Sequence, residues 1–327
     1  MIEMLSTMFS YHFMQRALIV GVLVSLCAAL LGVSLVLKRY SMIGDGLSHV
    51  GFGSLAIATA MGLSPMLVTI PVVVVAAFLL LRLSTRGKLK GDAAIAMIST
   101  GALAMGVIVL SLSTGMTSDV NNYLFGSVLA MSVSDVRLSI VLAIIVLILF
   151  VVFYRQIFAV TFDETFARAT GSHAEAYNML LALLTAITIV LGMRVMGAML
   201  ISSLVIFPAL TAMRVCRSFR SVTICAAIIS VICFFIGLCA SYLLSTPAGA
   251  SVVIVNIISF IAFAVIGKAR RSSFKKRERA LPELSIRQGF LWFSGSCRIR
   301  SCRYCWPHCG WKPRRCCKAT QAGTGAN

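Results

Sequence analysis

Asp45 and His49 are the residues of this sequence whose types and spacing could do chemistry inside an apolar segment. They lie in Gly44-Asp45-Gly46-Leu47-Ser48-His49, which opens an apolar run that continues to Leu63. If the chain is helical here, the carboxylate and the imidazole project from one face, one turn apart. Both groups cost free energy in or beside hydrocarbon unless a partner compensates them. The pair is therefore a candidate cation site that faces the interior of a helix bundle.

The composition indicates what kind of fold must position this pair. The 327 residues are 59% hydrophobic and 12% charged, with a mean hydropathy of +0.97. Such a chain is too apolar for a soluble globular domain. We therefore expect an all-α polytopic membrane protein.

The apolar segments predict eight or nine transmembrane helices, since a spanning helix needs about 20 apolar residues and fewer where it is broken or sheltered. Nine candidate segments are present, at residues 17–37, 46–61, 65–81, 93–113, 138–154, 177–193, 197–213, 222–244 and 250–267. The second is short and begins beside Asp45, which indicates a broken helix next to a cavity. Residues 121–131 are too few to span and are expected to be re-entrant or interfacial.

The basic residues predict the orientation of the chain in the membrane. Lys and Arg are concentrated in residues 82–90, 154–168 and 214–220 and after residue 267, and these parts are expected to face the cytoplasm. Residues 114–135 and 245–249 contain no Lys or Arg and are expected to face outside.

The charge distribution also divides the chain into two parts. Residues 1–267 contain 14 Lys and Arg against 8 Asp and Glu, a net charge of +6, whereas residues 268–327 contain 15 against 2, a net charge of +13. We expect a transmembrane domain over 1–267 and a basic, Cys-rich, disordered cytoplasmic tail over 268–327. Basic residues after a last span are typical of anchors to membrane lipid, and without a recognisable binding fold they indicate no nucleic-acid partner.

The tail leaves two alternatives to disorder open. Cys302 and Cys305, followed by His308 and Cys309, have the spacing of a small zinc site. The composition of the tail also differs so strongly from the rest of the chain that out-of-frame translation would explain it.

Absent motifs narrow the function. The sequence contains no G-x-x-x-x-G-K-[ST], no H-E-x-x-H and no G-x-S-x-G, so it predicts neither nucleotide hydrolysis by this chain nor an intramembrane protease or hydrolase. We expect a transporter that is not itself an enzyme and that holds no permanent cofactor.

A second motif lies in a predicted cytoplasmic segment, Phe162-Asp163-Glu164-Thr165-Phe166-Ala167-Arg168-Ala169-Thr170-Gly171. Read as one amphipathic helix, it places Phe162, Phe166 and Ala169 on one side and the charges on the other, with Gly171 as its C-terminal stop. Such a helix either lies on the membrane surface or docks into a groove of a partner and transmits movement.

The segment Lys38-Arg39-Tyr40-Ser41-Met42-Ile43-Gly44-Asp45-Gly46-Leu47-Ser48-His49 resembles the signature of the membrane-spanning permeases of the bacterial zinc/manganese/iron ABC importers, the ABC-3 metal-ion family. The resemblance continues through Phe13-Met14-Gln15-Arg16-Ala17-Leu18, Asn122-Tyr123-Leu124-Phe125-Gly126-Ser127 and Thr246-Pro247-Ala248-Gly249, and covers residues 10–267. Gly46 stands where many members have a larger residue.

The resemblance implies a type II-like ABC importer permease in the bacterial inner membrane. Its implied partners are a second permease copy or a paralogue, cytoplasmic ATP-binding subunits and an extracytoplasmic metal-binding protein. Asp45 and His49 would line the path of a zinc, manganese or iron ion. A coupling helix at about residues 160–171 would enter the ATPase subunit with Phe162, Asp163, Glu164, Phe166, Ala167 and Gly171.

One carboxylate and one imidazole form only part of a coordination shell, since Zn²⁺ takes four ligands and Mn²⁺ more, mostly oxygen. A two-fold dimer would bring two Asp45 and two His49 together. Two other functions fit the residues alone: a secondary carrier driven by protons through Asp45 and His49, or a membrane scaffold in which the pair is structural.

Overall fold

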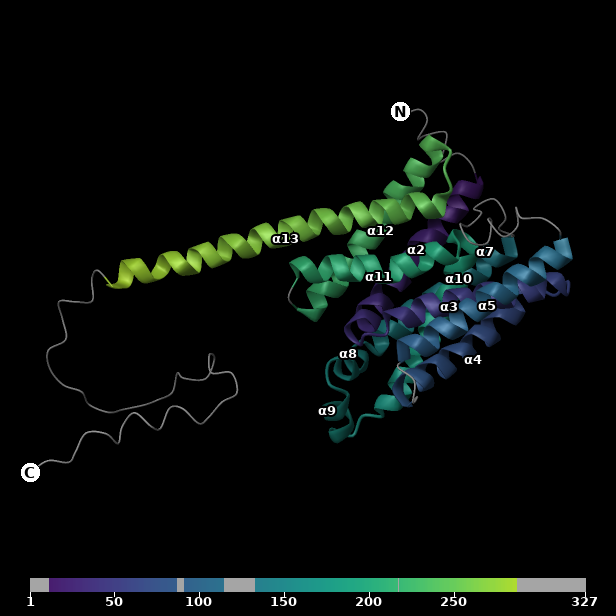
Figure 1. Cartoon of the computed structure of the whole chain (residues 1–327), viewed down its shortest axis with the longest axis horizontal. Coiled ribbons are helices and arrows are strands. Elements are labelled where there is room, and N and C mark those ends of the chain that lie inside the picture. Colours follow the sequence, from purple (N-terminus) through teal and green to yellow (C-terminus); the bar gives the residue numbers. More distant parts are fainter. Residues whose placement is uncertain (1–11, 87–90, 115–132, 217, 287–327) are drawn as a thin grey trace, which may run out of the picture. The chain divides into compact units, whose positions relative to one another are not determined.

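The computed structural model describes residues 12–86, 91–114, 133–216 and 218–286, and every regular element within them is a helix. The chain divides into two units, Met1–Ser272 and Ser273–Asn327. The helices, labelled in Figure 1, are α2 (His12–Leu37), α3 (Ser41–Ala60), α4 (Pro65–Arg86), α5 (Gly91–Thr114), α7 (Val133–Val152), α8 (Tyr154–Phe162), α9 (Glu164–Ala169), α10 (Ala174–Met196), α11 (Ala198–Val215), α12 (Phe219–Leu244) and α13 (Ala248–Ile286).

The predicted all-α membrane architecture is confirmed. Among the described residues, eight helices are long and apolar enough to cross a membrane, and each coincides with a predicted span. The ninth predicted segment is α3, which has 20 residues but is less apolar. The predicted re-entrant segment at residues 121–131 and the cysteines of the tail lie outside the described residues, whereas α13 continues as a helix to Ile286, beyond the predicted end of its span.

The helices α2 and α10 form the centre of the first unit. Two thirds of the membrane-crossing window of each is buried, compared with 22% for α13. Both are apolar around their whole circumference, as expected of helices enclosed by others. The helices α11 and α12 pack on α2, while α3 and α4 pack on α10.

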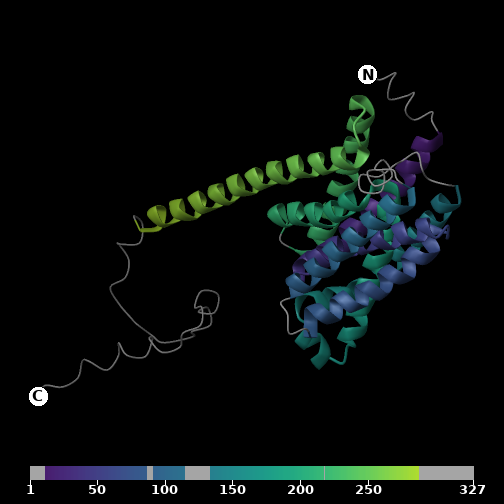
Figure 2. The ribbon, with the colours of Figure 1, turned by 45° about the vertical axis from the view of Figure 1, so that its right-hand side comes forward.

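The helix that carries Asp45 and His49 differs from the prediction. It is not broken and does not begin at Gly46: α3 is continuous from Ser41 to Ala60. Its first turns are polar but largely buried, because α3 lies against α4 and α5 (Figures 1 and 2). A methyl group added at Gly53 would lie 2.6 Å from the carbonyl oxygen of Ala102, so the backbones of α3 and α5 are in close contact there.

The second motif forms two helices, so the prediction of a single helix is wrong. Asp163 separates α8 from α9 in an extended conformation, with φ −147° and ψ 97°. Its carboxylate Oδ1 accepts a hydrogen bond from the backbone N–H of Phe166, 2.9 Å away, and caps α9. Asp favours this arrangement over a helix interior, because its short side chain satisfies a backbone donor that the first helical turn leaves open.

The predicted stop at Gly171 is confirmed. Gly171 has φ 84°, a conformation that glycine adopts without steric cost. The backbone N–H of Ser172 donates to the carbonyl of Ala167 at 3.0 Å, which closes the C-terminus of α9.

An ion pair joins α7 and α10 at the end of the bundle away from α8 and α9. The guanidinium Nη2 of Arg194 donates to Oδ2 of Asp135 at 2.8 Å, and both side chains are mostly buried. Directly after α10 ends at Met196, the helical path breaks at Gly197, where φ is 87°, and α11 begins.

Candidate functional site

Asp45 and His49 lie on one face of α3, as the sequence predicts. The imidazole Nε2 of His49 is 3.7 Å from Oδ2 of Asp45, too far for a hydrogen bond. The Asp45 side chain is 40% exposed and that of His49 is 17% exposed, so the carboxylate opens outward from the chain. The pair is close but not bonded.

The other imidazole nitrogen of His49 is also without a hydrogen bond. Nδ1 is buried and has no partner among the described residues. Buried polar atoms are nearly always paired, and an unpaired one calls for an explanation. The imidazole of His49 and the carboxylate of Asp45 are thus not committed to each other, and Nε2 and Oδ2 can turn to one ligand.

The separation of the pair suits a shared metal ion. Zinc lies about 2.1 Å from nitrogen and oxygen ligands, so two ligands of one ion can be at most about 4.2 Å apart. The observed 3.7 Å falls within this limit. Across the described parts of the chain, no group of three or more His, Cys, Asp and Glu side chains is arranged to hold a metal ion. One chain therefore offers an incomplete shell.

The residues of the second motif form a separate cluster around α9. Phe162 and Phe166 are 61% and 64% exposed, whereas Ala167 is buried against Val160 and Ala174. Phe162 also contacts Phe219 at the start of α12, with ring centroids 5.8 Å apart. The apolar contact of α9 with the bundle is therefore one small residue, while Phe162 of α8 and Phe166 of α9 present large apolar side chains outward.

The carboxylates of this motif are held in their charged form. Hydrogen bonds from Thr165 and from the backbone of Phe166 lower the pKa of Asp163. Burial raises the pKa of Glu164, but the hydrogen bond from Asn178 and the charges of Lys38 and Arg168 outweigh it, and the pKa lies below its ordinary value. Both groups are thus ionised at neutral pH.

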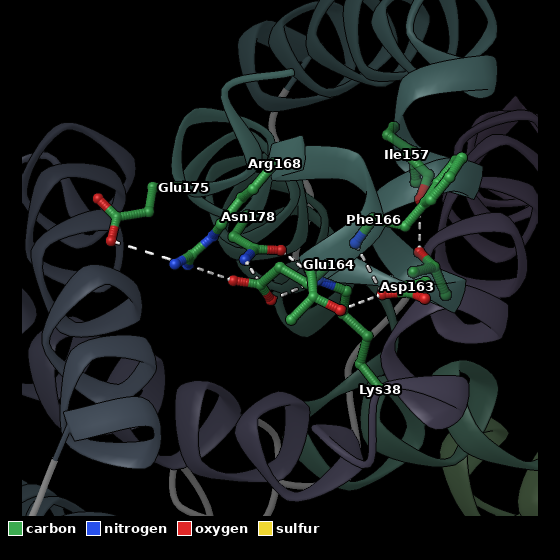
Figure 3. A network of polar contacts seen from close by, with 10 residues as sticks. Lys38, Ile157, Asp163, Glu164, Phe166, Arg168, Glu175 and Asn178 are labelled. Atoms are coloured by element: carbon green, nitrogen blue, oxygen red, sulfur yellow. Dashed lines mark hydrogen bonds and ion pairs between the residues drawn. The ribbon is translucent and has the colours of Figure 1, made fainter. Parts of the chain in front are cut away.

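Two residues with no role predicted from the sequence, Lys38 and Asn178, complete this cluster (Figure 3). Lys38, directly after α2, has its ammonium Nζ 3.8 Å from Oε2 of Glu164 and donates a hydrogen bond to Oδ1 of Asn178. Asn178 donates in turn from Nδ2 to Oε2 of Glu164, at 3.1 Å. An amide within the apolar run of α10 was the one signal that could have identified Asn178, since it needs a partner there.

The segments predicted to face the cytoplasm meet at one end of the bundle. A hollow of about 650 Å³ lies at this end. Arg82, near the end of α4, lines it together with Glu164 and Arg168 of α9. The ring of Tyr154 at the start of α8 lies 5.5 Å from that of Phe219 at the start of α12. Their meeting agrees with the predicted orientation, in which these segments share a side.

Comparison with known proteins shows which family has this arrangement of helices and motifs. The model of the ABC 3 transport family matches residues 10–267. The chain belongs to the ABC 3 transport family. The match includes both Asp45 with His49 and the α8–α9 motif, and with the eight apolar helices it makes the chain a multi-pass permease of the cell membrane.

The chain is similar in sequence to curated proteins along nearly the whole length of those proteins. The chain is 31% identical to the manganese transport system membrane protein MntC of Listeria monocytogenes, over 84% of this chain and 98% of that protein. It is also 31% identical to the high-affinity zinc uptake system membrane protein ZnuB of Haemophilus influenzae, over 77% of this chain and 96% of that protein. Among solved structures, PsaBC from Streptococcus pneumoniae in complex with Fab is similar, with a TM-score of 0.73 and 28% identity over 80% of this chain and 95% of that one.

Proposed function

We propose that this ABC 3 permease carries a divalent transition-metal ion, manganese, zinc or iron, into the cell and that a separate ATPase subunit supplies the energy. The observation that carries the proposal is the Asp45–His49 pair, whose ligand atoms lie 3.7 Å apart without a hydrogen bond between them. Relatives named for manganese transport and for zinc uptake support this class of cargo. Carboxylate and imidazole are ligands that all three ions accept.

The missing ligands come, in this proposal, from a second copy of the chain. The Asp45 side chain is 40% exposed and Met42, three residues before it, is 43% exposed, so this face of α3 can be reached from outside the chain. A two-fold axis beside it would bring two Asp45 and two His49 around one ion. Four ligands complete a shell for zinc, and water can add to it for manganese. Ligation that depends on two mobile halves also lets the ion leave.

The helix α9 is the proposed docking element for the ATPase subunit. It lies at the end of the bundle where the basic segments meet and exposes Phe166, next to the exposed Phe162 at the end of α8. Exposed aromatic side chains of this size are typical anchors in a partner's groove. An extracytoplasmic metal-binding protein would deliver the ion at the opposite end.

Uptake by the whole transporter, with its ATPase subunit and binding protein in lipid vesicles, tests the proposal. We expect ATP-dependent uptake of Mn²⁺ or Zn²⁺ and a loss of at least about tenfold in Asp45→Ala and in His49→Ala. The matched control is Asp92→Ala, which removes an exposed carboxylate from the first turn of α5. Normal uptake by both site variants would refute the metal path, and uptake driven by a proton gradient without ATP would show a secondary carrier instead.

The docking role has its own test. Phe166→Ala should weaken binding of the ATPase subunit at least about tenfold and leave the stability of the permease unchanged, because this side chain is 64% exposed. Leu112→Ala is the control. Leu112 is 83% exposed, but it lies at the C-terminal end of α5, away from the end of the bundle that carries α9. Equal binding by Phe166→Ala and wild type would contradict the docking role.

A further inference from the structure

Glu164, the first residue of α9, contacts the bundle and its own helix with different oxygens. Oε1 accepts a hydrogen bond from Arg168 of α9 at 2.6 Å. Oε2 accepts one from Asn178 of α10 at 3.1 Å and lies 3.8 Å from the ammonium of Lys38. Because Lys38 also donates to Asn178, the three residues close a ring that joins three parts of the fold (Figure 3).

The two members of the ring that belong to the bundle, Lys38 and Asn178, are buried. The side chain of Lys38 is 7% exposed and Asn178 is 8% exposed. Burial lowers the pKa of Lys38, and the charge of Glu164 opposes that shift. A buried ammonium is costly unless its partners stay in place, so Lys38 must follow the Glu164 carboxylate when that carboxylate moves.

The turn that carries Lys38 is short and tightly bonded. Only three residues separate the end of α2 at Leu37 from the start of α3 at Ser41. Within the turn, Arg39 has φ 61°, and the N–H of Tyr40 donates to the carbonyl of Leu35 at 2.8 Å. A turn held this way has little slack, so a displacement of Lys38 reaches the first turns of α3, where Asp45 lies.

A hollow beside Glu164 and Arg168, which Asn178 also lines, gives α9 room to move. Both line the hollow of about 650 Å³, which α4 and α10 border with Arg82 and Glu175. Apart from the ring, α9 is held on the bundle by the buried Ala167 and by the exposed ion pair of Arg168 with Glu175 of α10, 3.9 Å apart. A helix of six residues with one small buried contact and one exposed ion pair can tilt, and the hollow accepts the tilt.

We propose that Lys38 is a positioning residue that passes a displacement of α9 to α3, and so to Asp45 and His49. This inference rests on the proposed function, in which α9 contacts the ATPase subunit. Lys38 touches neither the ion nor the ATPase. Its role is to make the two ends of the machinery move together.

The number of metal ions taken up per ATP hydrolysed, measured on the whole transporter in lipid vesicles, tests the role of Lys38. In Lys38→Met this ratio should fall at least about tenfold, while ATP hydrolysis and binding of the ATPase subunit stay within about twofold of wild type. Lys38→Arg keeps the charge and should restore at least half of the ratio. Lys268→Met removes an exposed lysine at the end of the span of α13 and should leave the ratio unchanged.

A double-variant cycle separates this role from general damage. Glu164→Gln should lower the ratio as Lys38→Met does, and the two together should lower it no further, because each breaks the same link. An unchanged ratio in Lys38→Met, or additive losses in the double variant, would overturn the proposal. If Lys38→Met does not assemble, the reversed pair Lys38→Glu with Glu164→Lys decides: recovery above the Lys38→Glu single variant supports the link, and no recovery overturns it.

Failure of this inference is distinguishable from failure of the docking role. If α9 does not bind the ATPase subunit, Phe166→Ala retains full binding. If only the link is wrong, Phe166→Ala loses binding while Lys38→Met keeps its ratio.

Discussion

Nε2 of His49 and Oδ2 of Asp45 are 3.7 Å apart, within reach of one metal ion but beyond a hydrogen bond. A structural pair would instead be bonded, and removing one partner would leave a buried group unpaired at a cost of about 1–3 kcal/mol. The distance therefore separates a binding role from a structural role in a way that stability measurements can check.

Asp45→Asn should scarcely change the stability of the metal-free protein but should remove its stabilisation by metal. At a metal concentration 100 times the Kd, wild type gains about 2.7 kcal/mol, and a chelator reverses the gain. Thermal unfolding in detergent, with and without Mn²⁺ or Zn²⁺, measures both effects. Asp92→Asn is the control and should respond to metal as wild type does. Stabilisation of Asp45→Asn equal to that of wild type would show that the ion binds elsewhere.

Gly53→Ala should separate α3 from α5. Its new methyl group would meet the backbone oxygen of Ala102 at 2.6 Å, and a backbone atom cannot turn aside. We expect a loss of about 1–3 kcal/mol in unfolding free energy, measured by denaturation in mixed micelles. Gly101→Ala is the matched control, because no heavy atom outside its own helix lies within 4 Å of the added methyl group. It should gain about 0.5–1 kcal/mol, and equal effects at the two sites would contradict the close contact.

Asp135→Asn should destabilise the fold by about 3 kcal/mol, because it leaves the mostly buried guanidinium of Arg194 without its charged partner. Adding Arg194→Met should recover part of the loss, since no unpaired charge then remains. Unfolding of the single and double variants gives the coupling energy. The exposed pair of Arg168 and Glu175, 3.9 Å apart, is the comparison: Glu175→Gln should cost less than about 1 kcal/mol. A similar small cost for Asp135→Asn would mean that the inner pair is solvated.

The attachment of α9 should weaken in acid. The pKa values of Asp163 and Glu164 are lowered in the folded protein, so each carboxylate stabilises the fold fully above its ordinary pKa of about 4. That contribution is lost as the pH falls through the lower, folded-state pKa. Hydrogen exchange of the α9 amides, corrected for the intrinsic rate at each pH, should show protection decreasing over this range.

Two comparisons test the cause of this acid effect. Asp163→Asn keeps a capping oxygen that does not titrate and should reduce the pH dependence. The first turn of α12 is capped by the hydroxyl of Ser218, which accepts from the N–H of Ser221, and should keep its protection. Equal losses in α9 and α12 would indicate general unfolding.

Hydropathy was sufficient to predict the membrane helices but not the start of α3. The segment was expected to begin at Gly46, because Ser41, Gly44 and Asp45 lower its hydropathy. In the structure these residues are helical, since enclosure by α4 and α5 does not require an apolar sequence at every position. The pair itself was predictable, because its spacing and type depend on one helix only.

The link through Lys38 could not be predicted from local patterns. Lys38 and Asn178 are 140 positions apart in the sequence, and nothing in either neighbourhood specifies the other. The break between α8 and α9 at Asp163, in contrast, is predictable from a local pattern. An Asp three residues before the amide that it caps is a common helix start, and the amphipathic pattern of the motif concealed it.

The outward opening of Asp45 has a consequence for the life of the protein in the cell. A newly inserted copy carries a carboxylate that is 40% exposed on a helix whose residues are mostly buried. In a single copy that charge faces lipid or trapped water, where it is costly. In the proposed two-fold dimer the two carboxylates would repel each other until a cation lies between them. The ion would then favour the assembled form, so the same carboxylate would tie assembly to the supply of metal.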